Sequence, residues 1–501
     1  MSTELTFSPL SEMAKGAIQA CNAATGTLGP KGLNAYIDDA MVPKITNDGF
    51  TIISKIELND KLQNMGVKIV KSATARTVDE AGDGTTTTAV LLKATIEEAM
   101  KRPENPMIVR ASIREALPKV LKAIEKTAKK IDKKDIKSVV MISAEDETLA
   151  TAISNIINKM GDNPRVDIED SSDNSTSYEM TDGYEAHVGF MSMDFVTEKT
   201  RARCIMQDVG VFVTDKKIST IGDVQPLFKM LGDNAISKIV IVCDDIDNAV
   251  LGQFILNKRM GVLSSCVIRA QGDVLKDIEA CVGAKRVSDS TGVSFQNITT
   301  DCLGYCKKIT VDAKRTLFVA SDLSKSKQYA IALEKEGREE RNQFVRDRIM
   351  RRVSQLRGGI AVLRIGGPNF NREYLKDKAD DAVKAAKSAL EEGVVEGGGM
   401  CLYRVGEAMN PKTIGEQILK KILSAPLRTI IENCGLDYTE IVKNMPEGMG
   451  YDARKNIYTT MVESGIIDPA KVERVSLINA IHDATDLITS HVSIYEYTKE
   501  V

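Results

Sequence analysis

The hydrophobic pattern of the chain changes its period twice, and this change constrains the fold more than any other feature. Apolar residues recur at helical spacing from Leu62 to Arg102. Between about residues 182 and 359, short β-branched runs such as Val211 to Val213 and Ile239 to Cys243 alternate with helical stretches. Helical spacing returns after Leu375 and dominates to the C-terminus. The sequence therefore predicts an α/β block inserted into a helical domain.

Composition excludes several classes of protein. A chain of 501 residues is too long for one ordinary core, so two or three domains are expected. Hydrophobic residues make up 43% and charged residues 27%, which is the balance of a soluble globular protein. The formal net charge is −3, and Lys and Arg are interspersed with Asp and Glu, so we expect no nucleic-acid partner. The chain has only 3 histidines, so any catalysis is expected to use carboxylates.

Targeting and cysteine patterns predict a reducing, cytoplasmic location. No apolar run approaches the length that spans a bilayer, and the N-terminal residues lack the pattern of a signal peptide, so no membrane partner is expected. The 9 cysteines are an odd number without disulfide-like spacing. Cys302 and Cys306 lie close in sequence, but no second pair or nearby histidine completes a zinc site.

The sharpest local signal is the run Gly82-Asp83-Gly84 followed by threonines at 85 to 88, which open a helix. Glycines let a backbone approach closely, and a helix N-terminus offers free N–H groups to an anion. Asp83 would repel a phosphate unless a divalent cation lies between them. A simpler interpretation is that Asp83 caps the helix and that the threonines form a capping cluster. The ordinary P-loop pattern is absent.

Three further segments carry weaker signals, because each alone is an ordinary turn or cap. Residues 27 to 32 form a Gly-Pro turn, and Asp48 lies in a turn-like stretch before Gly49. Three successive glycines at 397 to 399 follow a helical stretch and have the pattern of a C-cap with a link. Residues alone do not decide between these interpretations and a nucleotide site.

Taken together, these segments resemble a known family. TLGPKG, ITNDG, GDGTTT, EEGVVEGGG and GIIDPAKV occur in this order from Thr27 to Val472, and they are similar to the ATP-site signature of chaperonins. GGIAVLRIG at 358 to 366 and APLRTIIENCG at 425 to 435 resemble the bacterial-type branch. The chain is identified as a divergent member of the group I chaperonins.

The resemblance implies a role for each matching residue. Asp83 would bind Mg²⁺, and Asp48 and Asp381 would orient and activate the water that attacks the γ-phosphate. A K⁺ ion would lie near Thr27, Asn47 and Thr86. The residues implied to contact the nucleotide are Thr27, Leu28, Gly29, Pro30, Asp83, Gly84, Thr85, Thr86, Thr87, Gly398, Asp452, Ala453, Ile466 and Asp468, the last as an acceptor for ribose hydroxyls.

The implied fold is a mixed α and α/β chaperonin fold with three domains. A helical equatorial domain would comprise residues 1–126 and 392–501. A small intermediate domain, at 127–181 and 360–391, would carry Asp381 onto the nucleotide. The inserted α/β block, 182–359, would be the apical domain that binds other proteins.

The implied function is an ATPase that helps other proteins to fold. Identical subunits would form a ring, with seven per ring in the family, and non-native client proteins would be bound and encapsulated, with a co-chaperonin as a further possible partner. Near residues 250 to 256 there are two neighbouring i, i+4 apolar stripes. The residues alone favour a helix buried on both sides, whereas the resemblance implies an exposed binding face. The positions that match the family's client contacts are Phe190, Phe195, Phe228, Leu251, Ile255 and Leu256.

Two departures from the family pattern support an alternative. Asp194 and Gln225 are polar where the family usually has apolar residues in the client groove. A ring-forming scaffold or holdase with little ATP turnover would fit such a groove. The presence of Asp48, Asp83 and Asp381 argues against it, because a scaffold that does not hydrolyse ATP has no need of all three.

Overall fold

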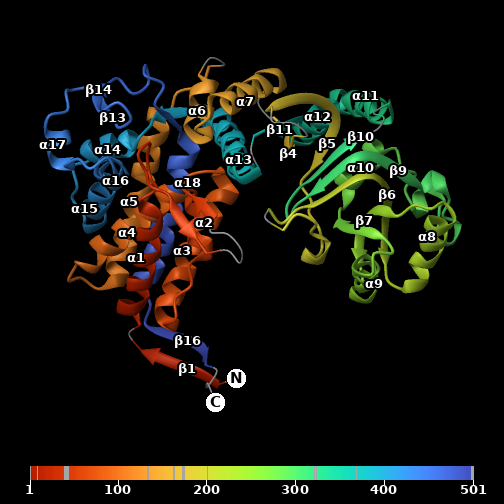
Figure 1. The fold of residues 1–501 in the computed structure, drawn as a ribbon, viewed down its shortest axis with the longest axis horizontal. Helices are drawn as coiled ribbons and strands as arrows, with labels where there is room; N and C mark the ends of the chain where they lie inside the picture. The colour runs from red at the N-terminus through yellow and green to blue at the C-terminus, as the bar shows by residue number, and fades with distance from the viewer. Residues whose placement is uncertain are drawn as a thin grey trace. The chain divides into compact units, whose positions relative to one another are not determined.

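The chain divides into two compact units, one inserted into the other. The computed structural model describes residues 2–7, 9–38, 44–132, 135–161, 164–171, 175–199, 201–320, 322, 324–367 and 369–497. One unit comprises Met1–Asn158 and Ile365–Val501, and the other comprises Lys159–Arg364 (Figure 1). This arrangement confirms the prediction of an α/β block inserted into a helical domain. The finer division into equatorial, intermediate and apical domains stays a prediction.

The first unit is built on packed helices, among which α1, α3, α4 and α18 contact one another around a common core (Figure 1). The periodic runs predicted as helices are confirmed, and α4 begins at Thr85 as its sequence indicates. The helices of this unit are α1 (Leu10–Thr25), α2 (Gly49–Lys55), α3 (Lys61–Ala81), α4 (Thr85–Met100), α5 (Pro106–Thr127), α6 (Ile136–Ala144), α7 (Glu147–Met160, which runs into the second unit), α13 (Asn369–Glu392), α14 (Met400–Glu407), α15 (Ile414–Ile422), α16 (Ala425–Asn433), α17 (Tyr438–Lys443) and α18 (Ala470–Ile488).

Short antiparallel strand pairs occur in this unit. They are β1 (Ser2–Phe7) with β16 (Val492–Tyr497), β2 (Ala35–Ile37) with β3 (Lys44–Thr46), β12 (Val394–Glu396) with β15 (Ile467–Pro469), and β13 (Gly450–Asp452) with β14 (Ile457–Thr459). Two of them, β1 with β16 and β12 with β15, join segments that are distant in the sequence. In the third pair Val395 lies opposite Asp468. Two of the five segments that resemble the chaperonin signature are therefore neighbours in space.

The second unit is organised around a mixed sheet, whose described strands follow the order β4-β11-β5-β10-β9-β6-β7-β8. Strands β6, β7 and β8 are parallel and are connected through helices, as parallel neighbours require. The strands are β4 (Val166–Asp170), β5 (Ser177–Ala186), β6 (Cys204–Ile218), β7 (Lys238–Ile246), β8 (Ser264–Arg269), β9 (Leu303–Val311), β10 (Thr316–Ala320) and β11 (Gly359–Ile365).

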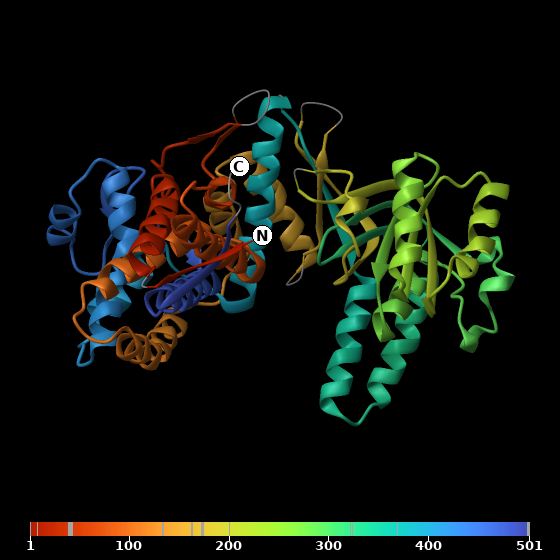
Figure 2. The ribbon, with the colours of Figure 1, turned by 90° about the horizontal axis from the view of Figure 1, so that it is seen from below.

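Helices accompany this sheet and complete the mixed α and α/β architecture that the sequence predicts. Helices α8 and α9 make the parallel crossovers, and α11 and α12 pack together as a hairpin, drawn in teal in Figure 2. The helices are α8 (Ile221–Asp233), α9 (Asn248–Arg259), α10 (Gly272–Val282), α11 (Ser324–Glu339) and α12 (Gln343–Arg357). Among the described residues, none of the helices has the length and apolar character needed to cross a membrane.

Candidate functional site

The turn between α3 and α4 contains the strongest sequence signal, and its geometry depends on glycine. Helix α3 ends just before Gly82 (φ 79°) and α4 begins just after Gly84 (φ 91°), and both glycines are in the left-handed region. A Cβ atom on Gly84 would lie 2.4 Å from Ser476 Oγ and 2.7 Å from Val472 Cγ1. A side chain at this position would therefore collide with α18.

Asp83 does not cap α4, so the simpler interpretation of this residue is wrong. The N-cap is Gly84, and no side chain among the described residues caps the helix. Asp83 instead accepts hydrogen bonds from Gly84 N (2.6 Å) and from Ser143 Oγ (3.0 Å). The backbone N–H groups of the first turn are therefore free of a side-chain acceptor, as a helix N-terminus that binds an anion requires.

Asp48 lies at the start of α2, next to the first turn of α4. Its carboxylate accepts hydrogen bonds from Phe50 N (3.2 Å) and Thr51 N (2.8 Å), so it is the N-cap of α2. A Cβ atom on Gly49 would lie only 2.3 Å from Thr86 Oγ1. The glycine therefore allows the beginnings of the two helices to touch, and Asp48 is held there.

Helix α13 brings a third carboxylate, Asp381, to the same place. A Cβ atom on Gly82 would lie 2.2 Å from Lys384 Cβ, so α13 contacts the α3–α4 turn. Burial, together with the negative charges of Asp83 and Asp48, raises the pKa of Asp381 well above its usual range. The structure thus brings together three aspartates that stand far apart in the sequence.

A fourth carboxylate comes from the β12–β15 pair. Asp468 Oδ2 accepts a hydrogen bond from Gly398 N at 3.0 Å, and a Cβ atom on Gly397 would lie 3.1 Å from Asp468 Oδ1. Burial raises the pKa of Asp468 to about 6, and the charge of Asp83 contributes in the same direction. Asp468 therefore belongs to the same electrostatic environment as Asp83.

Several residues predicted to lie around the nucleotide share one apolar cluster beside Asp468. Leu28, Ala453 and Ile466 pack in a cluster with Met400, Leu427, Ile430, Ile431, Tyr451 and Met461. Gly398 lies against this cluster, because a Cβ atom there would be 3.2 Å from Met461 Cε. Asp452 is buried, and its Oδ1 accepts from Arg454 N and Lys455 N at 2.9 and 3.1 Å, so its side chain stabilises the β13–β14 turn.

The turn at residues 27 to 32 is attached to α16 by one side chain. Asn433 Nδ2 donates to the carbonyl oxygens of Thr25 and Leu28, each at 2.9 Å. Gly29 has φ 89° and faces Ile430. Lys31 Nζ donates to Asn456 Oδ1 at 2.7 Å. The turn at residues 27 to 32, which is predicted to border the nucleotide, is therefore held by Asn433 on α16 and by Asn456.

Replacing Asn433 with alanine is expected to loosen this turn, because two carbonyl groups lose their donor. Losing hydrogen bonds of this kind costs about 1–3 kcal/mol, which corresponds to roughly tenfold more frequent local opening. Trypsin cleavage after Lys31 should accelerate by about the same factor. Asn410→Ala, on an exposed segment of the same unit, is the control. Equal cleavage rates in the two variants would contradict the attachment.

Glu473 is a functional candidate that the sequence reasoning missed. It lies in the first turn of α18, is 4% exposed, and its Oε2 has no hydrogen-bond partner among the described residues. Burial raises the pKa of Glu473 to about 8, with further contributions from Asp468 and Asp83. The available signal was a glutamate between Val472 and Val475, on an otherwise apolar helix face.

In the second unit, the predicted client-contact residues are divided between core and surface. Leu256 on α9 is 48% exposed, whereas Leu251 and Ile255 are partly buried against the core. Phe190 and Phe228 are likewise partly buried. These five side chains are consistent with an accessible edge on this unit.

The prediction for Phe195 is wrong in this structure. Its side chain is 0% exposed and belongs to the hydrophobic core of the second unit, with Lys258 Nζ lying 6.0 Å from the ring centroid. Residue type alone does not distinguish a core phenylalanine from a surface contact. In α9, Val250 and Phe254 are also fully buried, so only one of the two predicted apolar stripes is available.

The polar residues that depart from the family pattern are on the surface of this unit. Asp194 forms an ion pair with Arg259 (2.6 Å) at the end of α9, and the hydrogen bond from Arg259 lowers the pKa of Asp194. Gln225, on α8, is exposed. Polar groups therefore border the partly exposed apolar edge of α9.

Comparison with known proteins agrees with this geometry. The model of the TCP-1/cpn60 chaperonin family matches residues 21–492. The crystal structure of chaperonin gp146 from bacteriophage EL of Pseudomonas aeruginosa, in the presence of ATP-BeFx, is similar over 99% of both chains, with a TM-score of 0.72 and 19% sequence identity. A second crystal form of that chaperonin gives a TM-score of 0.66 at the same identity and coverage.

These matches confirm the predicted chaperonin fold, and the low identity agrees with a divergent member. The family model covers nearly the whole chain, including the segments that carry Asp48, Asp83, Asp381 and Asp468. The chain belongs to the TCP-1/cpn60 chaperonin family.

Proposed function

We propose that the chain is an ATP-hydrolysing chaperonin subunit that binds non-native proteins and encapsulates them in a ring. The observation that carries the proposal is the convergence of Asp48, Asp83 and Asp381 at the uncapped N-terminus of α4. Carboxylates beside a phosphate-binding helix end can orient and activate a water for in-line attack. A scaffold without turnover has no need of this arrangement.

The proposed nucleotide site follows the contacts of the first unit. The first-turn N–H groups and hydroxyls of residues 84 to 87 would hold the phosphates. The apolar cluster that contains Leu28, Ala453 and Ile466 would face the base, with Gly29, Pro30 and Gly398 at its edge. Asp468 would accept from the ribose hydroxyls. A phage chaperonin of the same fold was crystallised in the presence of ATP-BeFx, which supports a nucleotide ligand.

The residues present fit the Mg²⁺ and K⁺ that the family resemblance implies. Among the described residues no set of three His, Cys, Asp or Glu side chains forms an ion site of its own. Mg²⁺ usually takes one or two carboxylates and completes its shell with phosphates and water, so Asp83 suffices. Bound Mg²⁺ would neutralise charge on the phosphates. The backbone of Asn47, together with Thr27 and Thr86, would lie near K⁺. The side-chain Oδ1 of Asn47 is also buried and has no hydrogen-bond partner among the described residues, so it leaves a further oxygen available there.

In this proposal Asp381 is the principal base. Burial and the charges of Asp83 and Asp48 raise its pKa, which favours the uptake of a proton, and its position on α13 is separate from the turn proposed to bind phosphate. Asp48 is already committed to two backbone N–H groups of α2, so it would orient the water rather than accept its proton. The proton would move from water to Asp381 as the γ-phosphate is attacked.

The remaining parts of the proposal rest on the family. We propose seven identical subunits per ring, a co-chaperonin lid, and client binding at the α9 edge formed by Leu251, Ile255 and Leu256 with Phe190 and Phe228. The equatorial, intermediate and apical division predicted from the sequence would then couple ATP turnover to client release. A cytoplasmic location stays a prediction.

The proposal is tested by measuring phosphate release from ATP with Mg²⁺ and K⁺, together with the size of the assembly. Slow turnover by a large ring, about 0.01–1 per second and abolished by chelating Mg²⁺, is the expected result, at the slow end of enzyme rates. Rings without turnover would favour the scaffold or holdase, for which the ion pair of Asp194 with Arg259 at the α9 edge is the supporting observation. Turnover by monomers would contradict the ring.

A further inference from the structure

A row of buried polar side chains connects α18 to the carbonyl group of Gly84 through the interior of the helical unit. Asn479 Nδ2 donates to Thr77 Oγ1 at 3.1 Å, and Thr77 Oγ1 lies 3.0 Å from Thr88 Oγ1. Thr88 Oγ1 donates to Gly84 O at 2.9 Å. Ser476 Oγ, from α18, donates to the same oxygen at 3.2 Å. The row therefore ends at the phosphate-binding turn.

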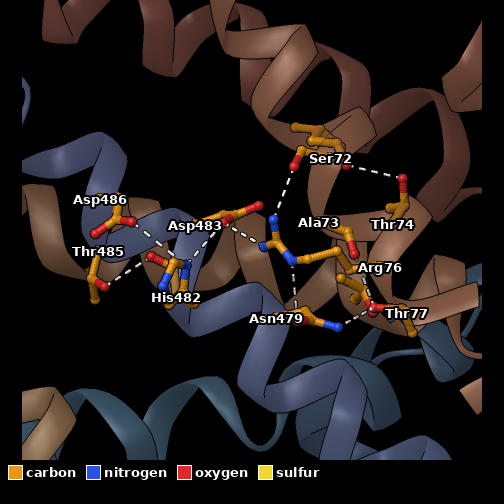
Figure 3. A network of polar contacts seen from close by, with 12 residues as sticks. Ser72, Ala73, Thr74, Arg76, Thr77, Asn479, His482, Asp483, Thr485 and Asp486 are labelled. Atoms are coloured by element: carbon orange, nitrogen blue, oxygen red, sulfur yellow. Dashed lines mark hydrogen bonds and ion pairs between the residues drawn. The ribbon is translucent and has the colours of Figure 1, made fainter. Parts of the chain in front are cut away.

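The outer end of the row is a charged cluster, shown in Figure 3. Arg76 extends from α3 and contacts Asn479 Oδ1 (3.5 Å), Asp483 Oδ1 (2.6 Å) and Ser72 Oγ (2.9 Å). His482 Nδ1 lies 3.1 Å from the same Asp483 oxygen. A guanidinium on the amide oxygen of Asn479 polarises its N–H groups and strengthens the donation to Thr77.

Because the residues of the row are buried, losing one of these hydrogen bonds is costly in free energy. Thr77, Thr88 and Ser476 are 0% exposed, and Asn479 is 5% exposed. Water therefore does not substitute for a missing partner, and each unmade bond leaves a buried polar group unsatisfied. Alanine or valine at these positions would fill the core with apolar groups that need no hydrogen-bond partner. The polar side chains of the row are therefore not needed merely to fill space.

The row fixes the direction of one peptide unit. The oxygen of Gly84 accepts from Thr88 N (2.9 Å), Thr88 Oγ1 and Ser476 Oγ, so this carbonyl is directed into α4 and toward α18. The N–H of Thr85 belongs to the same planar peptide and points the opposite way. Anchoring the carbonyl therefore aims this N–H out of the helix end, where a phosphate would lie.

We propose that Thr77, Thr88, Ser476 and Asn479 are positioning residues for nucleotide phosphate: they hold the Gly84–Thr85 peptide in its binding orientation without touching the nucleotide. The inference rests on the proposed ATPase function, and it assigns part of the site's affinity for phosphate to the interface of α3 with α18. Breaking the row should weaken the binding of the ground state and of the transition state equally, because the same N–H groups contact the phosphate in both.

Thr74 provides a matched control for Thr77. Both residues are on α3, both are 0% exposed, and each hydroxyl lies near the carbonyl four residues earlier, at 2.9 Å for Thr74 and 3.0 Å for Thr77. Only Thr77 also contacts Asn479 and Thr88. Thr77→Val and Thr74→Val remove the same atom from comparable surroundings.

The test is steady-state ATP hydrolysis by the full-length protein with Mg²⁺ and K⁺. Thr77→Val is expected to raise KM about tenfold with kcat within about twofold, whereas Thr74→Val leaves both near wild type. Thr77→Ser restores the hydroxyl and should restore KM. Ser476→Ala, which removes one donor to Gly84, should raise KM about threefold and serves if Thr77→Val does not fold.

The outcomes separate this inference from the proposed function. Active wild type with equal KM values for Thr77→Val and Thr74→Val would overturn the positioning role and leave the ATPase in place. A fall in kcat alone, or failure of Thr77→Ser to recover, would overturn it as well. A wild type that neither binds nor hydrolyses ATP would remove both.

Discussion

Replacing Asp381 with asparagine is expected to lower the rate of ATP hydrolysis at least about 100-fold while leaving ATP affinity within about threefold. Asparagine keeps the shape of the side chain but accepts no proton at neutral pH. Asp381 comes from α13, whereas the phosphates would be held by the turn before α4, so binding and hydrolysis separate. The site also loses one of several negative charges, which does not weaken the binding of an anion.

The measurement compares single-turnover phosphate release with binding of a fluorescent ATP analogue. Asp380→Asn is a matched control, because Asp380 is the preceding residue on α13 and pairs with Lys384 at 2.8 Å. We expect this variant to retain at least about a third of the wild-type rate. If Asp380→Asn slows hydrolysis as much as Asp381→Asn, a general disturbance of α13 explains both losses. Unchanged hydrolysis in Asp381→Asn would remove Asp381 from the mechanism.

Glu473→Gln is expected to make the ion-free and nucleotide-free protein more stable at pH 8.5 and to flatten its stability between pH 5 and pH 8.5. The pKa of Glu473 rises from 4.5 to about 8 in the folded chain, chiefly through burial. A raised carboxyl pKa contributes stability that is complete below the unfolded value and is lost as pH rises through the folded one. At about 1.4 kcal/mol per pKa unit, the loss amounts to a few kcal/mol.

Thermal unfolding as a function of pH measures this difference. The wild type should lose several degrees between pH 5 and pH 8.5 relative to Glu473→Gln, because glutamine carries no charge to bury. Glu447→Gln, at an exposed position of the same unit, should follow the wild type. If the pH profile of Glu473→Gln matches that of the wild type, Glu473 has a partner or solvent access that keeps its pKa ordinary.

The spacing of apolar residues in the sequence predicts the helices and strands but not how they pack together. The apolar spacing before and after the glycine turn predicts α3 and α4, and the β-branched runs predict β6 and β7. No local pattern shows that Asp48 and Asp381 belong to one site, because more than 300 residues separate them and only tertiary packing brings them near each other. The family resemblance supplied that pairing, and the geometry around Gly49 and Gly82 supports it.

The residues that sequence reasoning missed or misplaced share a physical cause. Helical threonines such as Thr74 and Thr77 look alike in sequence, and only the neighbouring helix decides which one joins the polar row. Phe195 and Leu256 are both large and apolar, yet one is fully buried and the other is 48% exposed. Glu473 was overlooked because a first-turn glutamate is ordinarily a favourable surface residue.

The strands at which the second unit begins and ends bear on whether this unit can fold by itself. Strands β4 and β11 are the first and last strands of that unit along the chain, and they are neighbours in its sheet. The chain therefore enters and leaves this unit on neighbouring strands, so a fragment spanning Lys159–Arg364 retains the strands of the sheet except for Ile365, the last residue of β11. Such a fragment is a candidate for expression alone, in which the proposed client binding could be tested without any contribution from nucleotide.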